Sequence, residues 1–364
     1  MLNFPAKSYI VPEPLGVSLV IGAWNFPYNL TFIPTIGSIM AGNTTIVKPS
    51  ELPAETSRIM AKIINENFDP NYLQVVEGGI PETTALLNQR YDKIFFTGSP
   101  KVGRIINQAA APHLTNVTLE LGGKNPAIFT KDCSLKVCVK RMIWAKFLNS
   151  GQLCIAPDYV LVHKKIKDRF LELAKEEIKK HNYSLENHNF IQIINERNFD
   201  RVVALIDPEK VYHGGKSSRE KRFIEPTILH NVTMDDAVME GEIFGPILPV
   251  LDFETLDEAF EIISNYEKPL SAYLFSNDRQ AKQRFLNELP FGSGGINEAV
   301  MQISNNNLPF GGVGNSGMGR YHGQFSFECF SHYKGIIDKS TLIETDLKYY
   351  GYSDQQLQLI KKLG

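Results

Sequence analysis

The first third of the chain alternates short apolar runs with amphipathic segments. Apolar, β-branched runs predict buried strands at "VSLVIGAW" (Val17–Trp24) and "TTIVKPS" (Thr44–Ser50). Isoleucines at helical spacing then predict a helix in "PAETSRIMAKIINENF", which has Pro53 near its start. Strand–helix alternation of this kind favours a parallel sheet with helices on both faces.

The same pattern continues toward residue 122. Three further runs, "LQVVEGG", "KIFFTGS" and "VTLELGG", predict strands that end in glycines, and "PETTALLNQR" and "KVGRIINQAAAPHL" predict helices between them. Parallel sheets bind ligands at the carboxyl ends of their strands. The turns "GAWNFP", "VKPSE", "FTGSPKVG" and "LELGG" are therefore expected to form a site.

A second α/β region follows a boundary that we expect near Gly122–Gly123. It has a predicted strand at Tyr159–His163, an amphipathic helix in "KIKDRFLELAKEEIKKH", and later alternating segments in "PTILHNV", "ILPVLDF", "TLDEAFEIISNY" and "LSAYLFS". The sequence thus predicts an α/β protein with two parallel-sheet domains.

Composition argues against several classes of function. The chain has 364 residues, 43% hydrophobic and 21% charged, which is typical of a globular protein with two domains and a sizeable core. A net charge of −2 gives no basic footprint for nucleic acid. No signal peptide, membrane anchor or zinc-like Cys/His spacing is expected, and four cysteines in a chain of this length favour the reducing cytoplasm over a disulfide framework.

Two glycine stretches could bind phosphate. "GSPKVG" (Gly98–Gly103) follows a predicted strand and opens a helix, so its amides could hold a pyrophosphate, although an ordinary turn explains it about as well. "GVGNSG" (Gly312–Gly317) has the formal dinucleotide spacing but follows no strand. We interpret it as a sharp loop connecting the domains.

Three polar residues are candidates for chemistry. Cys154 follows a helical pattern that stops near Gly151, where a thiol can be exposed in a cleft. Glu120 and Asn25 each come after a predicted strand and are expected to face the same cleft. A single cysteine more often fills a core, as we expect for Cys133 and Cys138, and a glutamate or asparagine alone is more often a surface charge or a turn residue.

Taken together, the motifs resemble the aldehyde dehydrogenase superfamily, specifically its class 3 and fatty aldehyde dehydrogenase branch. They are "GAWNFPYNL", "AGNTTIVKPSE", "FTGSPKVGR", "TLELGGKNP", "FLNSGQLCIAPDY", "EIFGPILPV" and "LPFGGVGNSGMGRYHGQFSFECFSH", and they occur in family order from about Ser8 to Lys334.

This resemblance implies a role for each candidate. Cys154 is expected to attack an aldehyde, Asn25 and the Cys154 N–H to hold the oxyanion, and Glu120 to activate the water that hydrolyses the resulting thioester. NAD is the expected cofactor, with NADP as an alternative. The residues implied to bind it are Lys48 and Glu51 at the adenosine ribose, Gly98, Ser99, Pro100, Lys101, Val102 and Gly103 at the pyrophosphate, and Glu242 and Phe244 at the nicotinamide.

The resemblance also implies a Rossmann-like cofactor domain, a catalytic domain and a small oligomerisation ribbon. We expect a ribbon remnant at 1–12, the NAD-binding domain at 13–121, the catalytic domain at 122–310, a return loop and oligomerisation strand at 311–340, and a tail at 341–364. Members of the family have several helices before the motif that matches "KSYIVPEPLG". The cofactor domain is therefore expected to be incomplete, and the return strand Ser8–Gly16 to lack its partner strand.

One further departure from the family pattern and two alternative functions are to be considered. Gly241 stands where the family usually has an acidic residue, which we expect to do little harm because Glu242 is retained. A CoA-acylating relative is disfavoured, since that branch lacks the glutamate equivalent to Glu120. A catalytically silent binding or scaffold protein stays open. The expected partners are a small aldehyde and a second copy of the chain in a homodimer.

Overall fold

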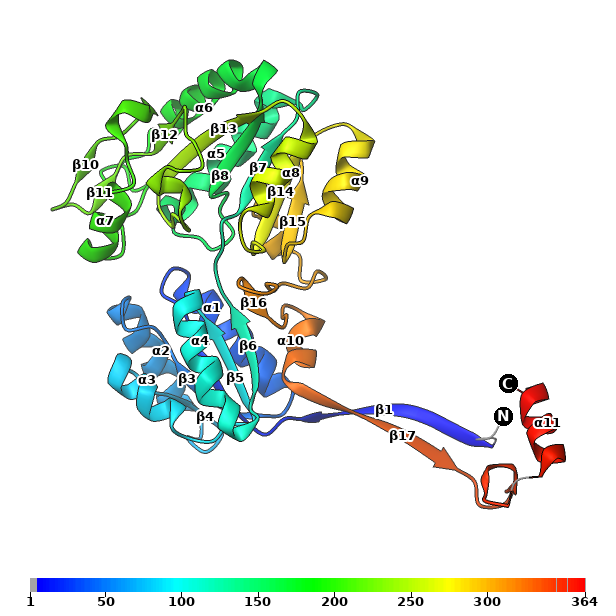
Figure 1. Ribbon diagram of the computed structural model, residues 1–364. Coiled ribbons are helices and arrows are strands. Elements are labelled where there is room, and N and C mark those ends of the chain that lie inside the picture. The colour runs from blue at the N-terminus through cyan, green and yellow to red at the C-terminus, as the bar shows by residue number, and fades with distance from the viewer. Residues whose placement is uncertain (1–4, 345, 352, 364) are drawn as a thin grey trace.

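The computed structural model describes residues 5–344, 346–351 and 353–363. It contains two α/β bodies, one above the other in Figure 1, and a long two-stranded ribbon that projects from the lower body. The predicted segments 1–12 and 341–364 therefore lie partly outside the described residues. No helix within the described residues is both long and apolar enough to cross a membrane.

The lower body is built on a six-stranded sheet in the order β16-β6-β5-β2-β3-β4. Neighbouring strands are parallel, except that β16 is antiparallel to β6. The strands are β2 (Val17–Ile21), β3 (Thr44–Lys48), β4 (Leu73–Val75), β5 (Lys93–Thr97), β6 (Asn116–Glu120) and β16 (Gly317–Met318). The helices are α1 (Pro27–Met40), α2 (Ala54–Asn67), α3 (Ile80–Leu87), α4 (Pro100–Ala110) and α10 (Gln324–Cys329). The predicted alternation of strands and helices is confirmed.

Burial explains why these runs form strands. Leu19, Val20 and Phe95 have no exposed surface, so the apolar residues in the middle of β2 and β5 are covered on both faces, as expected for parallel strands. Helix α1 begins at Pro27, whose missing N–H costs nothing at that position. Ser99 caps α4 by accepting a hydrogen bond from the Val102 N–H.

The upper body is built on a seven-stranded sheet in the order β15-β14-β7-β8-β13-β12-β9, of which only β9 is antiparallel to its neighbour. The strands are β7 (Pro126–Phe129), β8 (Tyr159–His163), β9 (Val211–His213), β12 (Thr227–Leu229), β13 (Ile247–Phe253), β14 (Ser271–Phe275) and β15 (Ser293–Ile296), with a small hairpin of β10 (Ser217–Ser218) and β11 (Phe223–Ile224). The helices are α5 (Leu135–Phe147), α6 (Lys167–His181), α7 (Glu196–Val203), α8 (Leu256–Ser264) and α9 (Arg279–Glu288).

Three strands of this sheet were not predicted from the sequence. β7 has only four residues and begins with a proline, β9 has only three residues, and β15 contains two adjacent glycines. Each is too short or too rich in glycine to reveal a period of two. β7 connects the two bodies, because the chain passes directly from β6 in the lower body to β7 in the upper body (Figure 1).

The ribbon consists of β1 (Ala6–Pro14) and β17 (Ser331–Lys339), which pair antiparallel along their whole length. The expectation that Ser8–Gly16 would lack a partner strand is therefore wrong. After the upper body the chain returns through β16 and α10, and β17 then runs back along β1 (Figure 1). Helix α11 (Asp354–Leu363) lies near the tip of the ribbon.

Candidate active site

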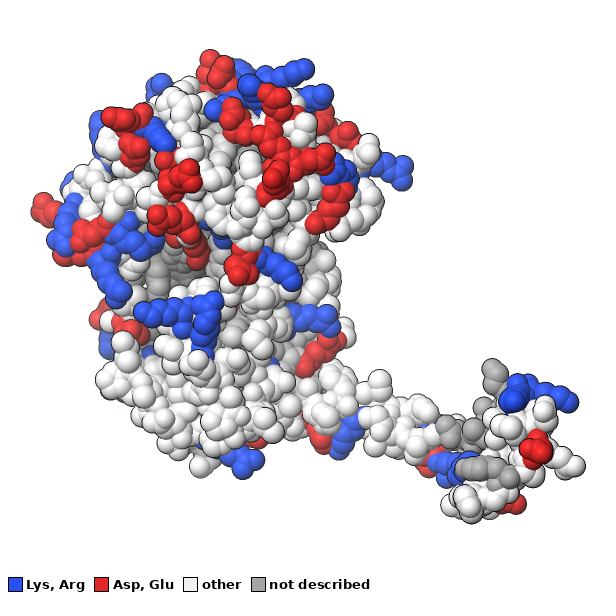
Figure 2. Space-filling view, in the orientation of Figure 1, with Lys and Arg blue, Asp and Glu red and all other residues white. Residues whose placement is uncertain are grey.

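A cavity of about 670 Å³ lies at the carboxyl ends of β2, β3, β5 and β6. Figure 2 shows the molecule hollowed between its two bodies, with charged side chains on both rims. Most of the residues predicted from sequence lie on the cavity wall: Asn25, Lys48, Glu51, Gly98, Ser99, Val102, Glu120, Cys154, Glu242 and Phe244. Pro100, Lys101 and Gly103 lie on α4 away from the wall.

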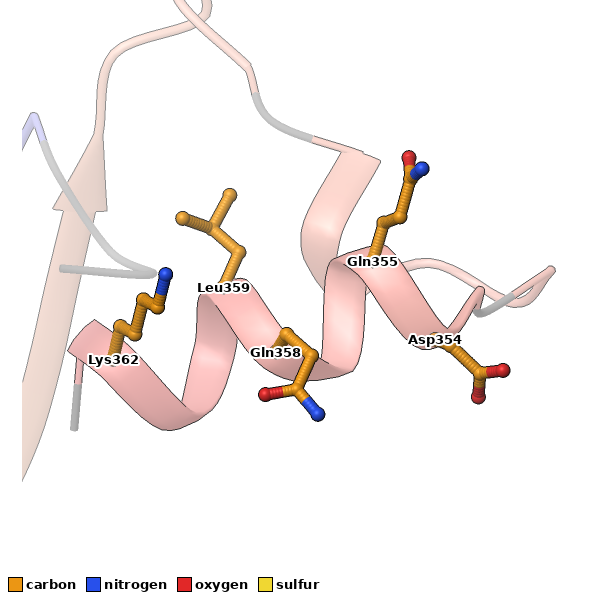
Figure 3. A pocket seen from close by; sticks show the side chains of 5 residues that line it. All are labelled: Asp354, Gln355, Gln358, Leu359 and Lys362. Atoms are coloured by element: carbon orange, nitrogen blue, oxygen red, sulfur yellow. The ribbon is translucent and has the colours of Figure 1, made fainter.

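A second hollow, beside α11, is different in character. Figure 3 shows its lining side chains, Asp354, Gln355, Gln358, Leu359 and Lys362, spread along one exposed helix. None of the residues that the sequence singled out lines this hollow. The cavity between the bodies is therefore the candidate site.

Cys154 follows a strained turn at the end of α5. Helix α5 ends at Phe147 and the 3₁₀ segment η2 (Leu148–Gly151) follows. Asn149, Ser150 and Gly151 have φ values of 55°, 56° and 72°, so three successive residues are left-handed. A Cβ on Gly151 would lie 2.3 Å from the carbonyl oxygen of Gly245, so only glycine permits this close approach. The turn directs the chain from the helix to the cavity wall.

Two asparagine amides hold the loop before Cys154. Asn25 and Asn149 each donate from Nδ2 to the carbonyl oxygen of Gln152 at 3.1 Å. Asn149 also donates to the carbonyl oxygen of Asn25 at 3.0 Å. The amide of Asn25 therefore lies beside the Cys154 loop, and one of its two N–H groups is engaged there.

Two further side chains hold the loop after the thiol. Asn125 donates from Nδ2 to the carbonyl oxygens of Cys154 at 2.7 Å and of Ala156 at 3.0 Å. The Tyr273 hydroxyl donates to the carbonyl oxygen of Ile155 at 2.6 Å. The backbone around Cys154 is thus fixed from both bodies, which is the preorganisation that a reactive group needs.

The thiol itself is neutral at pH 7 in the ligand-free protein. Burial, and then the charges of Glu242 and Glu120, raise the pKa of Cys154 to about 12. The N–H groups of Cys154 and Ile155 donate to the sulfur and oppose this increase. None of the groups that shift this pKa is a cation, so the thiolate is the minor form of Cys154 in the ligand-free protein.

Glu120 ends β6 with its carboxyl group buried. The residue is 2% exposed, and neither carboxyl oxygen has a hydrogen-bond partner within the described part of the chain. Burial raises the pKa of Glu120 well above its usual range. A Cβ on Gly311 would lie 3.2 Å from Oε1, so that glycine leaves room for the carboxyl group. A buried carboxyl group of raised pKa can serve as a general base near neutral pH.

Glu242 lies on a segment that an ion pair anchors. Lys124 and Asp158, both almost fully buried, form a salt bridge of 2.7 Å. Lys124 also donates to the carbonyl oxygens of Val238 and Gly241 at 2.6 and 2.7 Å, and Asp158 accepts from the Ile243 N–H at 2.9 Å. A side chain at Gly241 would meet nothing within 4 Å, so the glycine there is not required by packing.

The Glu242 carboxyl group also has a raised pKa. Burial and the charge of Asp158 raise it to about 8, while the Gly123 N–H, Arg201 and Lys124 oppose the increase. The next-but-one residue, Phe244, has a left-handed φ of 47° and contacts the Trp24 ring edge-on, with centroids 5.4 Å apart. An acid and an aromatic ring thus face the middle of the cavity from the upper body.

The other end of the cavity is polar and lies over β3 and α4. Lys48 is 2% exposed, its Nζ donates to the Pro49 carbonyl oxygen at 2.7 Å and lies 3.9 Å from the Glu51 carboxylate. Burial lowers the pKa of Lys48, and the Glu51 charge opposes this. A Cβ on Gly98 would lie 2.4 Å from the Phe96 ring, so the turn before α4 needs a glycine. Gly103 serves packing, since a Cβ there would lie 2.8 Å from Leu121.

These residues fit a dinucleotide. One cavity contains three features that a dinucleotide needs. They are the charged pair Lys48 and Glu51, which can contact ribose hydroxyls, the N-terminus of the eleven-residue helix α4, and the wall beside Cys154. Trp24, Ser50 and Thr97 lie in turns that were expected to form the site. Sequence reasoning missed another part of the wall: Leu52, Gly79, Ile80, Thr83, Thr84, Leu87, Asn198 and Arg201. The α3 residues in that set carry no chemical signature, so only the position of α3 beside α4 reveals them.

The remaining cysteines lie elsewhere. Cys133, Cys138 and Cys329 are free thiols that do not line the cavity. Cys138 is 2% exposed and belongs to the main hydrophobic core, and Cys133 packs against the same core. Of the four cysteines, Cys154 is the one that faces the site.

Comparison with known proteins adds independent information. The sequence profile described as "Aldehyde dehydrogenase family" matches residues 3–336. A Staphylococcus aureus protein named 4,4'-diaponeurosporen-aldehyde dehydrogenase is 47% identical over 346 residues, covering 94% of this chain and 75% of that protein. A rat protein named "Aldehyde dehydrogenase, dimeric NADP-preferring" is 47% identical over 338 residues, covering 92% and 75%. An Arabidopsis thaliana protein named aldehyde dehydrogenase family 3 member H1 is 44% identical over 370 residues, covering 100% and 76%.

Solved structures agree with these relatives. One described as the substrate-bound state of Staphylococcus aureus AldH superimposes with a TM-score of 0.96 at 45% identity, covering 99% of this chain and 80% of that chain. An NAD-dependent aldehyde dehydrogenase from Sinorhizobium meliloti gives a TM-score of 0.85 at 27% identity, covering 93% and 72%.

Proposed function

This chain belongs to the aldehyde dehydrogenase family, and on that premise we propose that Cys154 and Glu120 carry out its NAD(P)-dependent oxidation of aldehydes to carboxylic acids. The observation that carries the proposal is one continuous cavity with Lys48 and Glu51 at one end and Cys154 and Glu120 at the other. The lower body supplies Lys48, Glu51 and Glu120, and the loop that follows α5 of the upper body supplies the nucleophile.

In the first half-reaction, the Cys154 thiol gives its proton to solvent water in the open cavity, and its sulfur attacks the aldehyde carbon. The carbonyl oxygen then becomes an oxyanion, which Asn25 and the Cys154 N–H are positioned to hold, because both lie at the loop described above. A bound NAD(P)⁺ supplies the hydride acceptor, so that the aldehyde carbon leaves this step as a thioester of Cys154.

In the second half-reaction, Glu120 removes a proton from water, and the water oxygen attacks the thioester carbon. The carbon–sulfur bond breaks, the proton of the new carboxyl group passes to the Cys154 sulfur, and the carboxylate leaves while Glu120 releases its proton to solvent. Burial raises the pKa of Glu120, which makes its carboxylate a stronger proton acceptor than an exposed one and supports this role. A buried glutamate beside the thiol also argues against transfer of the acyl group to CoA.

The cofactor preferred by this chain is proposed to be NAD. Glu51 lies on the wall beside Lys48, where its carboxylate would repel a 2′-phosphate. NADP remains the alternative, because a relative with 47% identity is named NADP-preferring.

We further propose a cytoplasmic homodimer that accepts medium- or long-chain or aromatic aldehydes. Four free cysteines suit a reducing compartment. The ribbon exposes Tyr9, Ile10, Tyr333 and Ile337 to solvent, which supports contact with a second copy, and a relative is named dimeric.

The test is a nicotinamide fluorescence assay on the purified chain with a panel of aldehydes, NAD or NADP, and with or without CoA. NADH formation with carboxylate as the product is the expected result. Acyl-CoA as the product would contradict hydrolysis. Cofactor binding without turnover on any aldehyde would favour a silent binding protein.

A further inference from the structure

The Cys154 N–H belongs to a peptide unit whose orientation is fixed by a hydrogen bond. The carbonyl oxygen of this unit is that of Leu153, and it accepts a hydrogen bond of 3.0 Å from the Ala156 N–H. The bond closes a four-residue turn that contains Cys154. In a planar trans peptide the C=O and the N–H point in opposite directions, so fixing the Leu153 carbonyl group also fixes the direction of the Cys154 N–H.

The peptide unit of the Ala156 N–H is in turn held by Tyr273. The carbonyl oxygen of that unit is that of Ile155, and it accepts a hydrogen bond of 2.6 Å from the Tyr273 hydroxyl. Tyr273 lies on β14 and has no exposed surface. Burial raises the pKa of Tyr273 to about 12, so the hydroxyl keeps the proton that it donates. Two peptide units of one turn therefore connect the Tyr273 hydroxyl to the Cys154 N–H.

A second side chain, Gln302, donates to the Tyr273 hydroxyl. Gln302 lies on the 3₁₀ segment η6 (Met301–Ser304), and its Nε2 donates to that hydroxyl at 3.1 Å. It also donates to the hydroxyls of Ser271 and Ser293 at 3.3 and 3.5 Å. Hydrogen bonds in a series polarise one another, so a hydroxyl that accepts a bond is a stronger donor in the next one. Gln302 therefore both orients the Tyr273 hydroxyl and strengthens its bond to the Cys154 loop.

The backbone directly before Gln302 is strained. Val300 has a φ of 69° and a ψ of −37°, and the Met301 N–H donates to the Ala299 carbonyl oxygen at 2.8 Å. This geometry resembles the rare γ-turn of positive φ, which a β-branched residue seldom adopts. Strain of this kind persists only where the surrounding structure fixes it, and it is found at functional sites. The contact of Gln302 with Tyr273 is thus maintained against local backbone preference.

We propose that Tyr273, oriented by Gln302, is a positioning residue that aims the Cys154 N–H at the oxyanion. This inference rests on the proposed role of Cys154 as nucleophile. When the sulfur bonds to the aldehyde carbon, the carbonyl oxygen becomes an oxyanion, and an N–H already fixed in direction donates to it without reorganisation. The same N–H acts again when water attacks the thioester carbon, because the same oxygen becomes an oxyanion. Tyr273 itself forms no bond to the substrate and transfers no proton.

A purely structural role for Tyr273 makes a different prediction. If the hydroxyl only supported the loop, its loss would displace the sulfur, and every reaction of the thiol would slow. Iodoacetamide separates the two roles, because the sulfur then displaces iodide from a saturated carbon and no oxyanion forms. Tyr159 is the matched control. It lies in the same sheet, has no exposed surface, and its hydroxyl has no hydrogen-bond partner among the described residues.

The experiment compares Tyr273→Phe with Tyr159→Phe at saturating cofactor. First-turnover formation of reduced cofactor is followed by stopped-flow fluorescence, and decay of the thioester by acid quench and peptide mass. We expect Tyr273→Phe to slow both steps by a similar factor of roughly 10, below the 10²–10³-fold loss of an oxyanion donor itself. Iodoacetamide labelling of Cys154 should stay close to the wild-type rate. Tyr159→Phe should match the wild type in all three measurements. Normal rates of both steps in Tyr273→Phe, or an equal loss of labelling, would overturn the proposal.

A second variant tests Gln302 and does not depend on how well Tyr273→Phe folds. Gln302→Met removes the amide at similar side-chain length and should slow both steps about 3-fold, the effect of one weak hydrogen bond. In the Tyr273→Phe background it should add no further loss, because Gln302 acts through the hydroxyl. Additive losses would contradict this part of the proposal. The wild-type protein decides the underlying mechanism. An acyl group trapped on a residue other than Cys154 would make the proposed nucleophile wrong, whereas an acyl group on Cys154 with normal rates in Tyr273→Phe rejects the positioning role alone.

Discussion

The loop that carries Cys154 and the strand end that carries Glu120 face one cavity but differ in whether their polar groups are hydrogen-bonded. Around Cys154, the carbonyl oxygens of residues 152, 154, 155 and 156 each accept a hydrogen bond from an asparagine or tyrosine side chain. At Glu120, neither carboxyl oxygen has a hydrogen-bond partner among the residues that the structure describes. The difference teaches that the backbone is fixed by satisfied hydrogen bonds, while the groups that must exchange protons are left free to do so.

The largest expected effect comes from removing the thiol. Cys154→Ser should lower aldehyde oxidation by roughly 10⁴-fold or more, because a serine hydroxyl at its ordinary pKa is a poor nucleophile. NAD affinity, measured by nicotinamide fluorescence, should change little, since Lys48 and Glu51 lie at the other end of the cavity. Cys133→Ser is the control and should keep normal rates. Substantial activity in Cys154→Ser would show that the nucleophile lies elsewhere.

Glu120→Gln tests the other side of the comparison. We expect a burst of about one NADH per active site followed by turnover slowed by about 10²–10⁴-fold, because thioester formation does not need the base and hydrolysis does. Stopped-flow fluorescence measures both phases. Absence of the burst, in a variant with an unchanged melting temperature, would mean that Glu120 acts on the thiol instead.

Asn25→Ala tests whether a residue that holds the Cys154 loop in place also takes part in the chemistry. Removing one oxyanion donor should lower kcat by about 10²–10³-fold, with NAD affinity unchanged. Asn149→Gly removes the neighbouring amide that donates to the same carbonyl oxygen at 3.1 Å and tolerates the left-handed φ of 55°, so it reports the loss of loop support. Equal, small losses of kcat in both variants would make Asn25 a support of the loop and nothing more.

The smallest expected effect concerns the resting thiol. Because the pKa of Cys154 is about 12 in the ligand-free protein, its thiolate fraction should still rise about tenfold per pH unit between pH 8 and 10. Iodoacetamide labelling at Cys154, measured by peptide mass spectrometry, should therefore increase by about 100-fold over that range. A plateau near pH 9 would indicate a thiol of ordinary pKa.

Sequence reasoning was most successful where apolar runs and special residues recur with a clear period. It located β2, β3, β5, β6 and β8 and identified Cys154, Glu120 and Asn25, which the structure brings to one wall. It failed for β7, β9 and β15, which are short or rich in glycine.

It also missed contacts between distant segments. These contacts join residues far apart in the chain. They are the pairing of β1 with β17, the ion pair of Lys124 with Asp158, and the packing of Tyr321 against Phe95 of β5. Local pattern contains no information on such pairs.

The ribbon has a consequence for how this chain folds. Its register joins Ala6 to Lys339, so nearly the whole chain must be brought together before the first of these strand pairs can form. Closing so long a loop costs chain entropy and yields only one exposed two-stranded ladder in return. Contacts of high sequence separation form slowly. The two α/β bodies should therefore fold first and the ribbon strands should pair last. Their pairing should begin at Pro14 and Ser331, where the ribbon leaves the lower body.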